Sequence, residues 1–148
     1  MSENQFVLRR IYIKDASFES PQSPKGFVTQ WEPKINLDLN ARHTEIEKNL
    51  YEVVLHVTVT AKTGEDIVMY LVEVQQAGIF LIQGMEEEAK KQTLGSYCPN
   101  LLFPYAREAV DNLVLKGSFP PLMLGPVNFE SIYHQIEAEK ARHQNQIQ

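Results

Sequence analysis

The residues of this chain that could do chemistry are four histidines, one cysteine and a run of three glutamates. The histidines show no metal-ligand spacing, such as i, i+4 on one helix; they are His43, His56, His134 and His143. We expect His56 on the polar face of a strand and the last two on a solvated helix. A phosphate-cradling glycine loop and a nucleophile elbow are also absent from the sequence.

Cys98 is the single cysteine, so neither an intramolecular disulfide nor a cysteine-based zinc site can form. Its position before a possible helix could lower a thiol pKa, but no partner base lies near it in sequence, and we interpret it as a buried packing residue. Residues 86–88 are all Glu and could suggest a cation site, although a helix N-terminus favours such charges anyway. We therefore predict no enzyme activity, no cofactor and no metal.

Composition and charge narrow the class of partner. The 148 residues are 43% hydrophobic and 22% charged, which is typical of one globular domain. Fourteen basic residues stand against nineteen acidic ones, a net charge of −5, so we expect neither nucleic acid nor an anionic membrane as a partner. The first residues lack the pattern of a secretory signal, and no apolar run approaches the roughly 20 residues of a membrane span. We expect a soluble protein of a reducing compartment.

Four segments have the composition or alternation of β-strands, and they precede the helices. In the second segment the alternation is sharp, with apolar residues at Ile35, Leu37, Leu39 and Ala41. A short turn at 63–65 predicts that the third and fourth strands form an antiparallel hairpin. Gly78 interrupts the fourth strand and predicts either a bulge or a close backbone approach. We predict strands over residues 6–19, 34–41, 51–62 and 66–82.

After Gly84 the apolar period changes to that of helices. We predict a short charged helical turn at 85–93, after which Pro99 and Pro104 punctuate the chain. The apolar positions from Leu102 to Val114 predict a helix that stops at Gly117. Asn128 is a good N-cap for a last helix with one apolar stripe. The stripe ends at Glu137, and we expect a disordered tail from about residue 138. The order of elements predicts an α+β fold, in which two main helices pack on one side of a four-stranded antiparallel sheet.

The chain carries more apolar surface than one modest core needs. The surplus includes Phe27, Trp31, the loop from Phe119 to Leu124, and the second apolar face of the fourth strand. Large contiguous apolar surface on a soluble chain marks a subunit interface or a ligand groove. The alternative is that the loop folds over the edge of the sheet and buries this surface. The residues alone leave both interpretations open.

Four stretches resemble the SecB family of protein-export chaperones: Ile11–Glu19, Glu73–Phe80, Tyr97–Glu108 and Phe119–Phe129. The resemblance runs from about Phe6 to Tyr133, and it departs at Ala77, where the family usually has a second glycine before Gly78. It implies a cytoplasmic, ATP-independent homotetramer, a dimer of dimers. Such a protein holds precursor proteins unfolded and delivers them to the SecA motor for export, without direct membrane insertion.

The resemblance also implies roles for particular residues. A client-binding groove would use Trp31, Ile35, Leu37, Leu39, Phe129, Ile132, Tyr133 and Ile136. SecA docking would use Asp15, Glu19, Leu71 and Glu73. The interface between subunits would include Val72, Val74 and Gln76.

Two other functions remain open from the sequence. A SecB-like chaperone can serve one dedicated client, such as an antitoxin. A carrier of a small apolar ligand would enclose a discrete cavity, whereas a chaperone needs an open surface groove.

Overall fold

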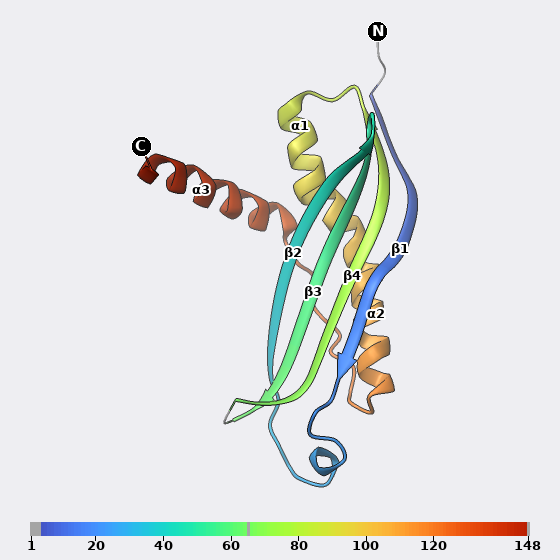
Figure 1. Cartoon of the computed structure of the whole chain (residues 1–148), viewed down its shortest axis with the longest axis vertical. Coiled ribbons are helices and arrows are strands. Elements are labelled where there is room, and N and C mark those ends of the chain that lie inside the picture. The colour runs from blue at the N-terminus through green and yellow to red at the C-terminus, as the bar shows by residue number, and fades with distance from the viewer. Residues whose placement is uncertain (1–3, 65, 148) are drawn as a thin grey trace.

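The chain forms one antiparallel sheet followed by helices, as the computed structural model of residues 4–64 and 66–147 shows (Figure 1). The sheet has the order β1-β4-β3-β2, so β1 and β2 are its edges. The predicted α+β class is confirmed. The strands are β1 (Gln5–Glu19), β2 (Lys34–Glu47), β3 (Leu50–Thr63) and β4 (Ile67–Gln83), and the helices are α1 (Glu87–Gln92), α2 (Cys98–Lys116) and α3 (Phe129–Ile147).

The core lies between α2 and one face of the two central strands. Alternate residues of β3 and β4 point toward α2, and on α2 the inward residues recur every four positions. These side chains are fully buried: Val53, Leu55, Val57, Val59, Val72, Val74, Leu102, Ala106, Val110 and Val114. Burial of an aliphatic side chain contributes about 1.5–3 kcal/mol. This layer therefore accounts for much of the stability of the domain.

β3 and β4 form the predicted antiparallel hairpin, although Glu65 of its turn lies outside the described residues. Gly78 lies at a close approach between layers, because a Cβ there would come within 3.0 Å of Leu102 Cδ2 on α2. Of the two alternatives at Gly78, close approach is correct. The nearby irregularity is on β1, between Leu8 and Arg10.

α1 and α2 are joined by a π-helical turn, Thr93–Tyr97, into one bent helical segment. α2 begins at Cys98, earlier than predicted, and holds Pro99 in its first turn directly after the π-helical turn. Pro104, expected to punctuate this segment, lies inside α2 without interrupting it. Its side chain is exposed, and the packing of Leu102 and Ala106 on the sheet outweighs the local loss of one backbone hydrogen bond.

The apolar loop after α2 mostly completes the core. α2 ends at Gly117 as predicted, and Phe119 and Leu124 are then buried against the sheet. Asp111 Oδ1 accepts a hydrogen bond from Leu122 N at 3.0 Å, which fixes the loop to α2. The alternative in which this loop buries the surplus apolar surface therefore holds only in part, because Pro120, Pro121 and Met123 of the loop and Phe27 outside it stay exposed.

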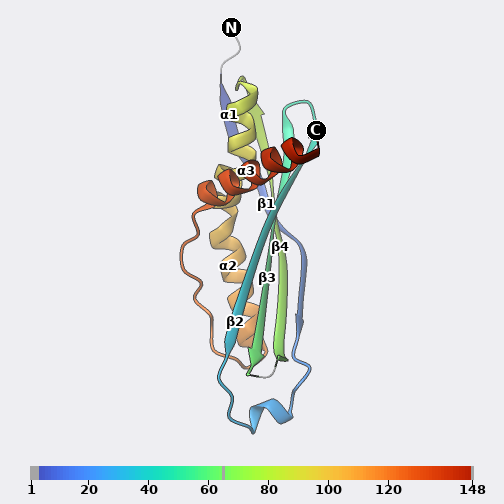
Figure 2. The ribbon, with the colours of Figure 1, turned by 90° about the vertical axis from the view of Figure 1, so that its left-hand side faces the viewer.

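α3 begins at its predicted cap, since Asn128 Oδ1 accepts a hydrogen bond from Ser131 N at 3.0 Å. It lies across β2 and projects beyond that edge of the sheet (Figures 1 and 2). The helix continues to Ile147, so the disorder expected from about residue 138 is not seen here. Side chains 138–145 are exposed, and backbone hydrogen bonds continue the helix after apolar packing has ended.

Candidate functional site

Apolar side chains are exposed along the helix-side face of β2. α2 covers the central strands and leaves this edge strand partly bare, so Ile35 is 43% and Leu37 is 37% exposed. Leu39, two residues further, packs partly against the core. This strip and the cavity described next are called the inner groove.

At the upper end of the strip, α3 and β2 enclose a cavity of about 400 Å³. The π-helical turn supplies its floor through Leu94 and Gly95. Five of the eight residues assigned to a client groove by resemblance line this cavity: Leu39, Phe129, Ile132, Tyr133 and Ile136. The apolar residues of α3 and of β2, which are far apart in sequence, therefore meet in this cavity.

The mouth of the cavity carries charge. Lys91, Glu137 and Lys140 all line it, together with His43. Partial loss of water around the imidazole, and then the nearby Lys140 ammonium, lower the pKa of His43 below its usual value. The cavity thus has an apolar floor and a polar rim, the usual anatomy of a binding site for an amphipathic chain.

Trp31 lies apart from this cavity, at the other end of β2. Its ring packs edge-on against Phe119 at 6.2 Å between centroids, within a cluster of aromatic rings. Ile35 and Leu37 lie between Trp31 and the cavity. From Ile35 to His43 the strand covers eight residue steps of about 3.4 Å, or roughly 27 Å.

Several cavity residues were missed from the sequence. Ala41 was placed on the apolar face of β2, and His43 continues the same alternation, so both could have been found. Gly95 and the later α3 residues could not, because neither belongs to an apolar stripe. The missed residues are Asn40, Ala41, His43, Leu55, Lys91, Leu94, Gly95, Glu137, Lys140, Ala141 and Gln144.

The opposite face of the sheet, the outer face, brings together the residues assigned to docking. Ser17 pairs with Glu73, and Glu19 pairs with Leu71, so neighbouring strands present these side chains in adjacent rows. Thr58 pairs with both Glu73 and Asp38, which adds a carboxylate that the sequence did not reveal. We call Asp15, Glu19, Asp38, Leu71 and Glu73 the outer acidic patch.

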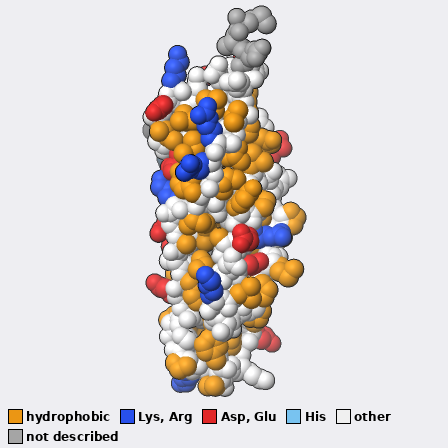
Figure 3. Space-filling view, turned by 90° about the vertical axis from the view of Figure 1, so that its right-hand side faces the viewer, with side chains coloured by type: hydrophobic (Ala, Val, Ile, Leu, Met, Phe, Trp, Pro, Cys, Tyr) orange, Lys and Arg blue, Asp and Glu red, His pale blue; other side chains and the backbone are white. Residues whose placement is uncertain are grey.

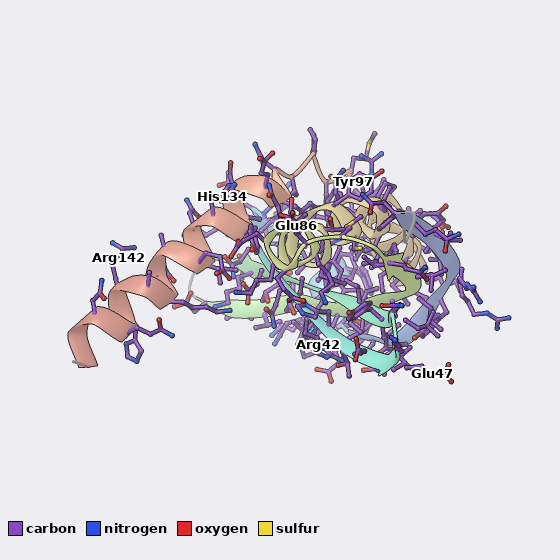
Figure 4. All side chains as sticks on the ribbon, turned by 90° about the horizontal axis from the view of Figure 1, so that it is seen from above. Arg42, Glu47, Glu86, Tyr97, His134 and Arg142 are labelled. Atoms are coloured by element: carbon purple, nitrogen blue, oxygen red, sulfur yellow. The ribbon has the colours of Figure 1, made fainter. Side chains whose placement is uncertain are left out.

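The outer acidic patch spans all four strands, three strand spacings or roughly 14 Å. Among the described residues, none of its carboxylates has an ion-pair partner within 4.0 Å. Arg42, on the same face, donates a hydrogen bond to Gln75 Oε1 at 3.0 Å and points away from the helices (Figure 4). The patch therefore offers unneutralised negative charge around Leu71.

A polar network lies above this patch on the outer face. Tyr12 donates a hydrogen bond to Glu52 Oε2, and Lys14 pairs with Glu52 Oε1 at 2.7 Å. The hydrogen bonds from Lys14 and Tyr12 lower the pKa of Glu52, while burial and then Glu52 raise the pKa of Tyr12 to about 12. Glu52 is therefore neutralised locally, unlike the carboxylates of the outer acidic patch.

The residues assigned to the subunit interface do not lie on the surface. Val72 and Val74 are 0% exposed under α2, and Gln76 is 3% exposed. Gln76 Nε2 donates a hydrogen bond to Tyr12 O at 3.1 Å, beside the irregular part of β1. These three side chains are thus covered within the protomer, and a role in the subunit interface stays a prediction of the resemblance.

Another surface of the protomer exposes apolar side chains to solvent. Figure 3 shows the side formed by β1 and α2, where hydrophobic side chains dominate and charged ones are scattered. The exposed large apolar residues of β1, the π-helical turn and α2 are Val7, Ile13, Tyr97, Tyr105 and Leu115, each more than two fifths exposed. Tyr97 also packs edge-on against Phe6 at 5.2 Å, so part of this surface is rigid.

Cys98 is buried in the core. Burial raises the pKa of the Cys98 thiol to about 12. His56 is on the outer face as expected, and His134 faces Glu130 at 3.7 Å on solvated α3. Within residues 4–64 and 66–147, no three His, Cys, Asp or Glu side chains are grouped to hold a metal ion. No helix in the same ranges is long and apolar enough to cross a membrane.

Comparison with known proteins gives one family. The family model described as preprotein translocase subunit SecB matches residues 1–140. The chain is 60% identical over 139 residues to the protein-export protein SecB of Marinobacter nauticus, covering 94% of this chain and 84% of that one. It is 58% identical over 131 residues to the protein of the same name in Pseudomonas aeruginosa, covering 88% and 80%.

A solved structure shares the fold. A SecB-like chaperone of Mycobacterium tuberculosis, in complex with a ChAD peptide from the HigA1 antitoxin, superposes with a TM-score of 0.70 at 16% identity. The match covers 82% of this chain and 90% of that one. At this identity the likeness concerns the fold alone.

Proposed function

The chain belongs to the SecB family of protein-export chaperones, and we propose that it holds precursor proteins unfolded in the inner groove and delivers them to the SecA motor. The observation that carries this proposal is the convergence of β2 and α3 on one apolar cavity. Both elements contribute side chains that the chain's own core leaves exposed. Such surface is suited to apolar segments that an unfolded protein exposes.

The groove suits many clients because its chemistry is simple. Each apolar side chain buried in it contributes about 25 cal/mol per Å² of area removed from water, without reading a particular sequence. An unfolded client loses chain entropy when it is held, so each local contact stays weak. Several grooves in one oligomer would restore affinity through multivalency.

Docking of SecA would use the outer acidic patch. Leu71 supplies an apolar anchor, and the surrounding carboxylates supply charge, which is the general anatomy of a docking surface. Charges of one sign speed the encounter with a basic partner, and this effect weakens as salt rises. Since the family resemblance implies no nucleotide, release would come from the motor competing for the client.

We also propose that the protein is a cytoplasmic homotetramer, a dimer of dimers. The apolar side formed by β1 and α2 supports self-association better than the buried residues of β4 do, because only the former presents side chains to solvent. Obligate interfaces between identical subunits are apolar surfaces of this kind.

Native mass spectrometry with and without an unfolded precursor tests the proposal. We expect a tetramer that gains one long unfolded chain and that suppresses aggregation of this client without ATP. A monomer that leaves aggregation unchanged would refute it.

The alternatives from the sequence are less well supported. The curated relatives are protein-export proteins, so a chaperone dedicated to one client is the less economical interpretation. A small-ligand carrier is also less well supported. The chain belongs to a chaperone family, and its cavity continues into an exposed strip along β2 instead of being closed.

A further inference from the structure

Positive side chains gather on the outer face, which is toward the viewer in Figure 1, at the end away from the outer acidic patch. Arg10 pairs with Ile79, and Ile79 pairs with Glu52, so Arg10 lies in the same cross-strand row as Glu52. Arg42 lies in the next row, two positions further along β3. Lys14 reaches the first row through its ion pair with Glu52. We call Arg10, Lys14 and Arg42 the outer basic patch.

The outer basic patch carries more positive charge than its surroundings neutralise. Lys14 pairs with Glu52 at 2.7 Å, so these two charges cancel. Among the described residues, neither Arg10 nor Arg42 has a carboxylate within 4.0 Å. Both arginines are exposed, and a hydrogen bond to Gln75 Oε1 holds Arg42 in place. These two guanidinium groups are therefore available to the carboxylates of a partner.

The basic and acidic patches are too far apart to neutralise each other. Arg42 and Asp38 are both on β2, four residue steps or roughly 14 Å apart along the strand. On β1, Arg10 and Asp15 are a similar distance apart, because their partners on β4 are also separated by four positions. Exposed charges are largely screened beyond about 8 Å at physiological ionic strength. The outer face is therefore positive at one end and negative at the other.

Such a face is complementary to a partner that carries both signs of charge. A segment that is basic throughout would be attracted by the acidic patch and repelled by the basic one. A segment with both signs is attracted at both ends, and in one direction only, so the charges also fix its orientation. A second copy of this chain would match in charge as well. Permanent contacts between identical subunits are apolar, however, and β1 and α2 expose apolar side chains of that kind.

We propose that the segment of the motor that docks on the outer face carries an acidic stretch beside its basic one, and that the outer basic patch binds the acidic stretch. This inference rests on the proposed function and deepens it by giving the chemistry of the docked segment. Arginine suits this role because its guanidinium group can donate two parallel hydrogen bonds to one carboxylate.

The spacing of the two patches sets the spacing within the partner segment. Arg42 and Asp38 are roughly 14 Å apart, a distance that about four residues of extended chain cover. Arg10 and Glu19 have partners on β4 that are eight positions apart, or roughly 27 Å. The acidic and basic stretches of the docked segment should therefore be separated by about four to eight residues.

Neutralisation of the outer basic patch tests the proposal by the sign of its effect. The double variant Arg10→Gln, Arg42→Gln keeps every carboxylate of the outer acidic patch. SecA docking in titration calorimetry should weaken by about three- to tenfold at low salt, and by less at high salt. A docked segment that is only basic predicts the reverse, because the variant removes two repelling charges. Docking that is unchanged or stronger would overturn the proposal.

A charge-matched variant controls for net charge. Arg142→Gln with Lys25→Gln also removes two positive charges, and both residues are exposed and lie outside the sheet. Docking by this variant should equal that of the wild type. An equal loss in the two double variants would show a general effect of net charge and overturn the proposal.

Two further measurements separate this inference from its alternatives. Native mass spectrometry should give the same oligomer for the wild type and the Arg10→Gln, Arg42→Gln variant. A change of oligomer with unchanged docking would assign the outer basic patch to a second copy of the chain and overturn the proposal. Glu73→Lys tests the docking surface itself. If it leaves docking intact, the proposed function fails at that surface. If it weakens docking and the arginine variant does not, the present inference alone fails.

Discussion

The ring of Tyr133 on α3 lies against Gly95 in the π-helical turn between α1 and α2. A Cβ on Gly95 would come within 2.5 Å of the Cδ2 atom of that ring, so only glycine permits this contact. The turn and the helix therefore define each other's position, and together they form the floor and roof of the cavity.

Gly95→Ala should displace Tyr133 and move α3 away from the turn. We expect a loss of about 1–3 kcal/mol in stability, the usual range for overpacking, and client affinity lower by several-fold. Urea unfolding and a peptide titration measure the two effects. Gly125→Ala is the matched control, since a Cβ there meets nothing within 4 Å. If both variants bind clients equally well, Gly95 does not position the groove.

Leu37→Arg should weaken client holding, because it places a charge in the apolar strip of the inner groove. Loss of one buried leucine contact, worth about 1.5–3 kcal/mol, corresponds to roughly tenfold or more in affinity. Suppression of the aggregation of an unfolded client measures it. Asn36→Arg, on the outer face of the same strand, should leave holding unchanged. Equal holding by wild type and Leu37→Arg would place the groove elsewhere.

Glu73→Lys should weaken SecA docking and leave client holding intact, because Glu73 lies on the face opposite the groove. Asp38→Lys should act in the same direction, because strand pairing places Asp38 on the same face of the sheet. Both effects should shrink as salt rises. Titration calorimetry with SecA measures them, and Glu139→Lys on solvated α3 is the charge-matched control. Docking that survives both outer-face variants would refute the assignment.

Val74→Ala should destabilise the fold of the protomer and leave the interface between subunits intact. Removal of two methyl groups from a fully buried position costs about 1–3 kcal/mol, which chemical denaturation would measure.

The contrasting variant is Leu115→Glu, because Leu115 is 52% exposed on the apolar side of α2. It should dissociate the oligomer in analytical ultracentrifugation and leave the fold of each protomer intact. The reverse pattern, with Val74→Ala dissociating stable protomers, would restore the interface first expected from the sequence.

Cys98 should be unreactive toward thiol reagents in the native protein and reactive after unfolding in urea. Burial raises its pKa from 9.0 to about 12, so the thiol stays protonated in the folded state. A folded pKa above the ordinary value adds stability below about pH 9, and this contribution is lost as the pH rises toward 12. Cys98→Ala should remove that part of the alkaline loss. Rapid native labelling at pH 8 would contradict the burial.

The order and type of the elements were predictable from the sequence because alternation and helical period are local signals. The hairpin of β3 and β4, the end of α2 at Gly117 and the cap at Asn128 each depend on a few adjacent residues. Pro104 shows the limit of such signals. Its local cost predicts a break, and the packing of its neighbours against the sheet overrides it.

The site was predictable where it follows apolar periodicity, as on β2 and the first turns of α3. Asp38 was missed because strand pairing, which the sequence does not encode locally, places it in the same cross-strand row as Glu73, with Thr58 between them. Val72 and Val74 were assigned to a subunit interface by the family resemblance, and an apolar strand face alone gives no indication of what covers it. In the structure the cover is α2 of the same chain.

Leu37 faces the groove and its neighbour Asp38 faces the outer acidic patch, so a single layer of backbone separates the two surfaces. A client and a docked motor would thus be sterically compatible, and a ternary complex requires no rearrangement of the sheet. Transfer of the client to the motor then depends on two quantities: the distance around the edge of the sheet between the two surfaces, and the local concentration at which the tethered client meets the motor.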